Sequence, residues 1–141
     1  MNTKHKGDAS SAAILAALVA LGQTVSVPWG ENAAYDLVLD TGGTLLRVQC
    51  KTGRLRGGRI VFQTSSVYRV GGRYTKFAYG DRVDRWAVYC PDNGKVYLIP
   101  AADVPNASQA TLHLEAPKVR NRYGYKLAAA YEVQKDTREG G

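Results

Sequence analysis

The chain contains few residues of the kinds that build cross-linked or metal-centred folds. Its 141 residues include two cysteines, two histidines and one methionine. Cys50 and Cys90 match no metal-ligand spacing, and a single pair of cysteines is too few for the disulfide framework of a small secreted domain. We therefore expect a cytoplasmic protein in which Cys50 is a reduced thiol that points into the core from a strand.

Long apolar runs are also missing. The most apolar stretch, residues 12–21, is far shorter than the ~20 residues of a membrane-spanning helix, and no small-residue cleavage site of a signal peptide follows it. Its larger side chains recur at helical spacing, with alanines between them: Ile14, Leu15, Leu18 and Leu21. We predict a helix from Asp8 to Leu21 that packs on a sheet and ends at Gly22, and no membrane partner.

Acidic residues are outnumbered by basic ones. The sequence has 19 Lys and Arg against 12 Asp and Glu, which gives a formal net charge of +7. Such an excess favours a polyanionic partner, although charge alone does not separate nucleic acid from an anionic membrane. The lack of a strongly amphipathic basic helix argues against the membrane. The length suits a single domain over residues 1–141.

The stretch from residue 34 to residue 51 predicts two strands joined by a tight turn. The segments on either side of Gly42-Gly43 are rich in strand-favouring apolar residues, and the glycines supply the positive φ of a short loop. A turn centred on these glycines gives three directly opposed pairs: Asp36 with Gln49, Val38 with Arg47, and Ala34 with Lys51.

The two-residue period of a strand divides the second of these strands into two faces. Leu46, Val48 and Cys50 point to one face, which we expect to be core. The other face gathers an acid, an amide, an amine and a guanidinium around one spot: Asp36, Gln49, Lys51 and Arg47. An ordinary half-exposed hairpin also alternates polar and apolar residues, so alternation alone does not identify a functional site.

At these residues the sequence resembles the PD-(D/E)XK nucleases. The signature of that superfamily is an Asp before a strand turn and then a Gln, Glu or Asp, any residue and a Lys on the next strand. Here it reads Tyr35-Asp36 and Gln49-Cys50-Lys51. The flanking segments NTKHKG, VSVPWGEN and VQCKTG, at residues 2–7, 25–32 and 48–53, resemble the group I intron-encoded homing endonuclease branch. They are more distantly similar to archaeal-type Holliday-junction resolvases.

The resemblance implies a fold, an activity and partners. The fold would be α/β, with a restriction-endonuclease-like core in which helices flank a mixed central β-sheet. The activity would be cleavage of double-stranded DNA with Mg²⁺ or another divalent cation, by a homo-oligomer that is a dimer or a tetramer. By the same resemblance, Asp36 and the backbone carbonyl of Cys50 would bind the metal. Lys51 would hold the phosphate or help to deprotonate the attacking water.

Two positions depart from the family pattern. Gln49 replaces the usual second acid, and its amide oxygen carries no negative charge. Ser11, with Ser10 beside it, stands where relatives tend to carry a Glu on the first helix. Asp36 is then the one obvious carboxylate for a dication, since Asp8 is expected to cap the helix or favour its dipole. We expect Ser11 to make cleavage slow or absent.

Three interpretations stay open from the sequence. The first is a homing-type endonuclease that is impaired in cleavage by Ser11. The second is a junction resolvase, and the third is a DNA-binding protein on a nuclease fold that no longer cuts.

Basic residues outside the signature are candidate DNA contacts. A hairpin is predicted at Gly57-Gly58, whose flanking arginines could enter a major groove and pair with guanine. The basic run from Lys118 to Lys126 suits phosphate contacts, in a C-terminal segment, 118–141, that contacts DNA in part or frays. The predicted DNA-binding residues are Lys4, Lys6, Arg54, Arg56, Arg59, Arg73, Arg120 and Arg122.

The remaining segments are predicted as follows. Strands are expected at residues 60–63, 85–90, 95–100 and 111–114, a helical turn at 101–104, and a long surface segment at 64–79. Isolated His5 and His113 are expected on an exposed arm and a strand face. Trp29 is expected to pack against its loop rather than to read a base.

Overall fold

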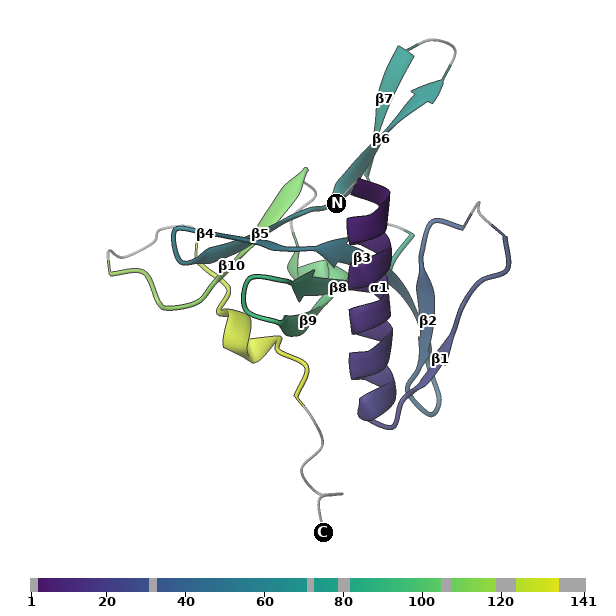
Figure 1. The fold of residues 1–141 in the computed structure, drawn as a ribbon, viewed down its shortest axis with the longest axis horizontal. Helices are drawn as coiled ribbons and strands as arrows, with labels where there is room; N and C mark the ends of the chain where they lie inside the picture. Colours follow the sequence, from purple (N-terminus) through teal and green to yellow (C-terminus); the bar gives the residue numbers. More distant parts are fainter. Residues whose placement is uncertain are drawn as a thin grey trace.

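The computed structural model describes residues 3–30, 33–70, 73–78, 82–104, 108–118 and 124–134. A five-stranded sheet forms a middle layer, with helix α1 (Thr3–Ala20) on one face and a three-stranded sheet against the other (Figure 1). This arrangement confirms the predicted α/β fold with a mixed central sheet. Within the described ranges α1 is the single α-helix.

The five-stranded sheet has the order β1-β2-β3-β8-β9. Neighbouring strands are antiparallel except β3 and β8, which run parallel. Its strands are β1 (Thr24–Ser26), β2 (Leu37–Asp40), β3 (Leu45–Thr52), β8 (Arg85–Cys90) and β9 (Lys95–Pro100). The three-stranded sheet, in the order β10-β5-β4, consists of β10 (Gln109–His113), β5 (Arg59–Gln63) and β4 (Arg54–Arg56). Two 3-10 helices are η1 (Ala101–Asp103) and η2 (Ala128–Ala130).

The helix α1 begins at Thr3, so the predicted start at Asp8 was wrong. Lys4 and Lys6 are good helix formers whose side chains are exposed, and the helix therefore continues past Gly7 toward the N-terminus. Asp8 lies inside the helix and cannot be its N-cap.

The end of α1 follows the prediction closely. Gly22 has a φ of 81°, and its N–H donates to the carbonyl of Val19 at 2.9 Å. The N–H of Gln23 donates to the carbonyl of Leu18 at 3.4 Å. These two bonds form a Schellman motif, in which the left-handed glycine ends the helix and turns the chain toward β1.

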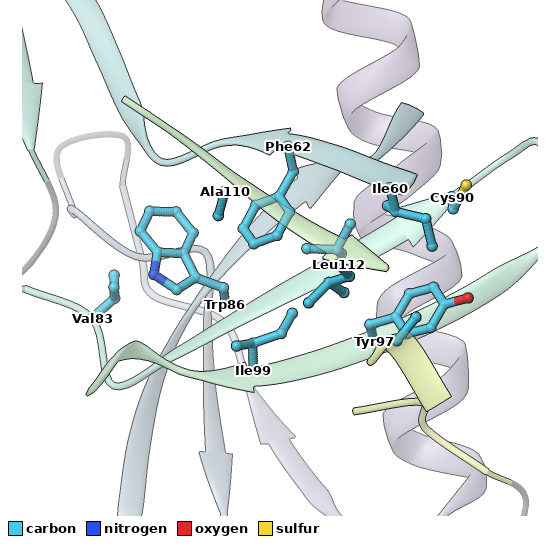
Figure 2. Close-up of a cluster of buried hydrophobic side chains, with 11 residues drawn as sticks. Ile60, Phe62, Val83, Trp86, Cys90, Tyr97, Ile99, Ala110 and Leu112 are labelled. Carbon is cyan, nitrogen blue, oxygen red and sulfur yellow. The ribbon is translucent and has the colours of Figure 1, made fainter. Parts of the chain in front are cut away.

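Alternate residues of the five-stranded sheet point into two separate cores. On the helix side, Ile14 and Leu18 of α1 are fully buried against Leu37, Leu39, Val48, Cys50, Ala87 and Val96. On the other side, β8 and β9 pack on the three-stranded sheet, and Figure 2 shows this cluster. There the rings of Phe62 and Trp86 lie with their centroids 6.3 Å apart. Strand β8 serves both cores, which explains its continuous apolar sequence.

The central hairpin has the predicted register from Leu37 to Asp40. Leu37 pairs with Val48 and Val38 with Arg47, around a turn in which Gly42 has a φ of 88°. The pairing ends at Leu37, so the predicted pairs of Asp36 with Gln49 and of Ala34 with Lys51 do not form.

Residues 65–70 and 73–78 form two paired strands where a long surface segment was predicted. Strand β6 (Ser65–Val70) pairs with β7 (Arg73–Ala78) in a separate two-stranded sheet. The two strands project at the same end of the molecule as the N-terminal end of α1 (Figure 1). The sequence did carry a signal for it, since Gly71-Gly72 stands between two strand-favouring segments just as Gly42-Gly43 does.

The other hairpin and strand predictions are confirmed in β4–β5, in β8–β9 and in β10. His113 lies on β10, where its ring makes an edge contact with Tyr125 at 5.9 Å between centroids. His5 lies within α1 and not on an arm. Cys50 and Cys90 are both free and buried. In the part of the chain that the structure describes, no helix is long and apolar enough to cross a membrane.

The C-terminal residues 124–134 run along β10 and β9. Lys126 accepts a hydrogen bond from the N–H of His113 at 2.7 Å, and Tyr131 accepts one from Leu98 at 2.8 Å. Glu132 forms a salt bridge of 3.0 Å with Lys95. This part of the predicted 118–141 segment is therefore fastened to the sheets, whereas Arg120 and Arg122 lie outside the described residues.

Candidate active site

Asp36 lies where β2 separates from β3. Its N–H donates to the carbonyl of Val48 at 2.8 Å, and its carboxylate oxygen Oδ2 accepts the N–H of Cys50 at 2.9 Å. The carboxylate thereby satisfies a strand N–H that continued pairing with β2 would otherwise satisfy. Asp36 is nevertheless exposed, so an acid that is anchored to β3 still faces solvent.

Gln49 and Lys51 flank Cys50 on β3 and alternate with it. They are half-buried beside the parallel strand β8, where Gln49 pairs with Trp86 and Lys51 with Val88. Burial lowers the pKa of the Lys51 ammonium, and the negative charge of Asp36 partly offsets that effect. Burial thus disfavours the charged ammonium relative to the neutral amine.

Helix α1 contacts the same part of β3 through two neighbouring serines. Ser10 is 2% exposed, and its hydroxyl hydrogen-bonds with that of Thr52. Ser11 hydrogen-bonds with the thiol of Cys50, whose pKa rises to about 12, chiefly through burial and then through the charge of Asp36. Cys50 is therefore contacted by Asp36 at its N–H and by Ser11 at its thiol.

Comparison with known proteins identifies the family. A family model described as PD-(D/E)XK endonuclease matches residues 1–134. The chain belongs to the PD-(D/E)XK endonuclease family. Its fold is similar to the solved structure of the bacterial homing endonuclease I-Ssp6803I, with a TM-score of 0.71 and 24% sequence identity over 100% of this chain and 99% of that one. Among curated proteins, no sequence matches the chain significantly.

PD-(D/E)XK endonucleases generally use divalent cations, which prefer several oxygen ligands with negative charge. Around Cys50 this member of the family offers one carboxylate from Asp36, one amide from Gln49 and one hydroxyl from Ser11. Throughout residues 3–30, 33–70, 73–78, 82–104, 108–118 and 124–134, no group of three or more His, Cys, Asp or Glu could hold a metal ion. The described residues therefore do not by themselves complete a dication site.

Arg47 is held by a partner that sequence reasoning missed. Its Nε and Nη2 donate to Asp84 at 3.1 and 3.3 Å, and its backbone N–H donates to Oδ2 of Asp84 at 2.8 Å. In return, the N–H of Asp84 donates to the Arg47 carbonyl at 2.8 Å. These bonds lower the pKa of the Asp84 carboxyl, with the guanidinium hydrogen bond as the largest cause. The guanidinium assigned to the Asp36 cluster thus serves to clamp β3 to the start of β8.

The arginines of the β4–β5 hairpin gather on one face. Arg56 pairs directly with Arg59, and Arg54 lies two residues along the same strand. All three are exposed, and among the described residues none of them forms an ion pair. Like charges directly opposite each other on a sheet are destabilising, so this arrangement favours an external anion. Gly57 and Gly58, with φ of 55° and 75°, form the tight turn at the tip.

The other predicted DNA contacts are placed less completely. Lys4 and Lys6 are exposed near the N-terminus of α1, where the helix dipole also favours negative charge. Arg73 lies on β7, and its side chain is outside the described set, as are Arg120 and Arg122.

The prediction for Trp29 was wrong. Its relative accessibility is 103%, so the indole does not pack against its loop. The other tryptophan, Trp86, is only 2% exposed, within the core shown in Figure 2.

Proposed function

We propose that this PD-(D/E)XK protein is a site-specific endonuclease of the homing type that binds duplex DNA and cuts it slowly or not at all. The observation that carries the proposal is the anchoring of Asp36 on the N–H of Cys50, beside the partly desolvated Lys51. That constellation brings a carboxylate and an amine together at β3, and both groups have roles in the hydrolysis of a phosphodiester.

Each side chain has a role that its position supports. Asp36 is the carboxylate toward which a divalent cation would be drawn, and the Cys50 carbonyl is a further oxygen on the same strand. A cation bound there would neutralise charge on the scissile phosphate. Lys51 holds the phosphate, or orients the attacking water and helps to deprotonate it, from its half-buried position near the charge of Asp36. Gln49 contributes a neutral amide that can hydrogen-bond with water or phosphate.

The limit on activity lies at position 11. Ser11 contacts Cys50 and so stands next to the residue on which Asp36 is anchored. A glutamate at that position would bring a second negative charge toward the site, whereas a serine hydroxyl brings none. The same observation favours the second candidate function, a DNA-binding protein on a nuclease fold that does not cleave.

DNA binding is supported by charges away from the cleavage site. The arginine face of β4–β5 begins at Arg54, directly after β3 and Gly53, so it continues the strand that carries Lys51. Arginines there suit base contacts in a major groove, and Lys4 and Lys6 suit phosphate contacts. Since each neutralised phosphate releases counterions, affinity should fall steeply as salt rises.

Assembly is part of the proposal. One active site cuts one strand, so a double-strand break requires at least a symmetric pair of chains, as a dimer or a tetramer. Sedimentation of the free protein and of its DNA complex would test this. A monomer in both states would contradict the assembly without contradicting DNA binding.

The decisive experiment compares the natural chain with Ser11→Glu on a DNA library. Cleavage is measured with Mg²⁺ present, and binding is measured with EDTA present. We expect both proteins to bind DNA with similar affinity. Ser11→Glu should cut the DNA, whereas the natural chain should cut it poorly. Ala12→Glu is the matched control. Ala12 is the exposed neighbour of Ser11, so a glutamate there adds the same charge but points it away from Cys50.

Lys51→Met in the Ser11→Glu background should abolish cutting and leave binding nearly unchanged. If the natural chain cuts efficiently and Asp36→Ala does not stop the cutting, the cleavage chemistry lies on other residues. Binding that does not change with salt would count against a nucleic-acid partner altogether.

A further inference from the structure

We propose that Trp29 contacts the bound DNA, so that its indole is buried against the duplex beside the cleavage site. This inference rests on the proposed DNA-binding function and adds to it an aromatic contact. Large aromatic side chains are mostly buried in folded proteins, so an indole left wholly in water is an informative exception. Here the exception occurs in the segment of chain that leads directly into Asp36.

The segment that carries Trp29 is fixed at both ends. Before it, Ser26 of β1 pairs with Val38 of β2. After it, Tyr35 packs against the core between the two sheets, and Asp36 is held on β3 by the two hydrogen bonds described above. The loop therefore starts and ends beside the candidate active site.

The chain length bounds how far Trp29 can lie from the site. Trp29 lies three positions after Ser26 in the chain, and Asp36 lies two positions before Val38. With extended-chain and strand-pair spacings, the Cα atoms of Trp29 and Asp36 lie within about 23 Å of each other. One turn of B-DNA is about 34 Å long, so a single duplex can contact both Asp36 and Trp29 within less than one turn.

The backbone is restricted on both sides of the exposed indole. Pro28 fixes its own φ before the tryptophan, and Gly30 follows with a φ of 93°, a conformation that glycine adopts without strain. Val27, two residues before the indole, is also 66% exposed. The loop thus carries two exposed apolar side chains, Val27 and Trp29.

Duplex DNA fits this surface better than a second copy of the chain does. A stable interface between proteins buries at least about 1,000 Å² in total, whereas a tryptophan supplies only about 150–250 Å². Binding to DNA takes most of its strength from phosphate contacts, for which this chain has a net charge of +7. One indole can then add measurably by stacking on a base or by inserting at a base step.

Tryptophan fluorescence tests the proposal, because the chain has only two tryptophans and Trp86 is buried. Acrylamide quenching is measured on the full chain in EDTA, with and without a mixed-sequence duplex about three helical turns long. Trp29→Phe identifies the residual signal of Trp86. We expect the duplex to protect the Trp29 component and Trp29→Ala to weaken binding about tenfold, as for loss of a stacked aromatic.

Leu45→Ala is the matched control. Leu45 is also an exposed apolar residue, at 67%, but it lies beside the Gly42 turn, at the end of β3 opposite to Lys51. Its affinity for the duplex should stay unchanged. If the natural chain binds the duplex while Trp29 stays open to acrylamide, the inference is wrong and the proposed function stands.

Protection that grows with protein concentration in the absence of DNA would assign the indole to a contact between copies and refute the inference. No binding to any duplex would reject the proposed function, and this inference with it.

Discussion

Gly53 joins β3 to β4, and replacing it with alanine tests how tightly the central sheet packs on the three-stranded sheet. A Cβ atom at this position would lie 2.8 Å from Cγ2 of Ile60 and 2.8 Å from Cγ1 of Val88. Both neighbours are fully buried β-branched residues, which have little freedom to change rotamer. The N–H of Gly53 also donates to the carbonyl of Tyr89 at 2.8 Å, which limits movement of the backbone away from the clash.

Overpacking of this kind costs about 1–3 kcal/mol. Two simultaneous contacts with fixed methyl groups favour the upper half of that range. Alanine also restricts the unfolded chain more than glycine does, and this effect offsets about 0.4–1 kcal/mol of the loss in stability. We therefore expect Gly53→Ala to lower the free energy of unfolding by about 1–2 kcal/mol, and the melting temperature by about 2–8 °C.

The assay is urea unfolding followed by circular dichroism. Gly43→Ala is the control, since a Cβ at Gly43 meets nothing within 4 Å and its φ is not in the left-handed region. That variant should be neutral or slightly more stable than the natural chain. Equal unfolding free energies for the two variants, within about 0.5 kcal/mol, would refute the close packing of the two sheets at Gly53.

Three further predictions concern single contacts. Ser10→Ala should lower the free energy of unfolding by about 1–3 kcal/mol, because Thr52 then keeps a part-buried hydroxyl without its partner, and adding Thr52→Val should recover part of the loss in urea titrations. Hydrogen bonds from Arg47 lower the pKa of the Asp84 carboxyl in the folded protein. The ionised carboxylate therefore stabilises the fold above the unfolded-state pKa of about 3.9, and this stabilisation is lost as the pH falls through the folded-state pKa. Asp84→Asn should then be less stable than the natural chain at neutral pH, and their unfolding midpoints should converge in acid; a constant difference across pH would contradict this. With its pKa raised to about 12, the buried Cys50 thiol should resist thiol reagents at pH 8 until the chain unfolds, and rapid labelling of the native protein would oppose that assignment.

Local patterns in the sequence were enough to predict most of the elements. The Gly42-Gly43 and Gly57-Gly58 turns place their strands correctly because a short hairpin depends on residues within a few positions of each other. The alternation of β3 also predicts its two faces, with Val48 buried on the helix side. The α/β fold with a mixed sheet and the endonuclease family came from the resemblance of the signature and its flanks, not from periodicity.

Tertiary structure decided what depends on partners distant in sequence. The parallel pairing of β3 with β8 brings Asp84 to Arg47, and no local pattern marks that carboxylate as a partner. The anchoring of Asp36 depends on the pairing of β2 with β3 stopping at Leu37, the residue next to Asp36. Only then is the N–H of Cys50 open to a side chain.

The same division holds at the candidate site and at the tryptophans. The sequence alone showed that Ser11 is not an acid, whereas the packing of α1 on β3 showed that Ser11 contacts Cys50. Composition cannot separate Trp29 from Trp86, since both have the same preference for burial. Trp86 lies on a strand enclosed by two layers, while Trp29 lies on a loop beyond the edge strand β1, where the described chain offers no layer to cover it.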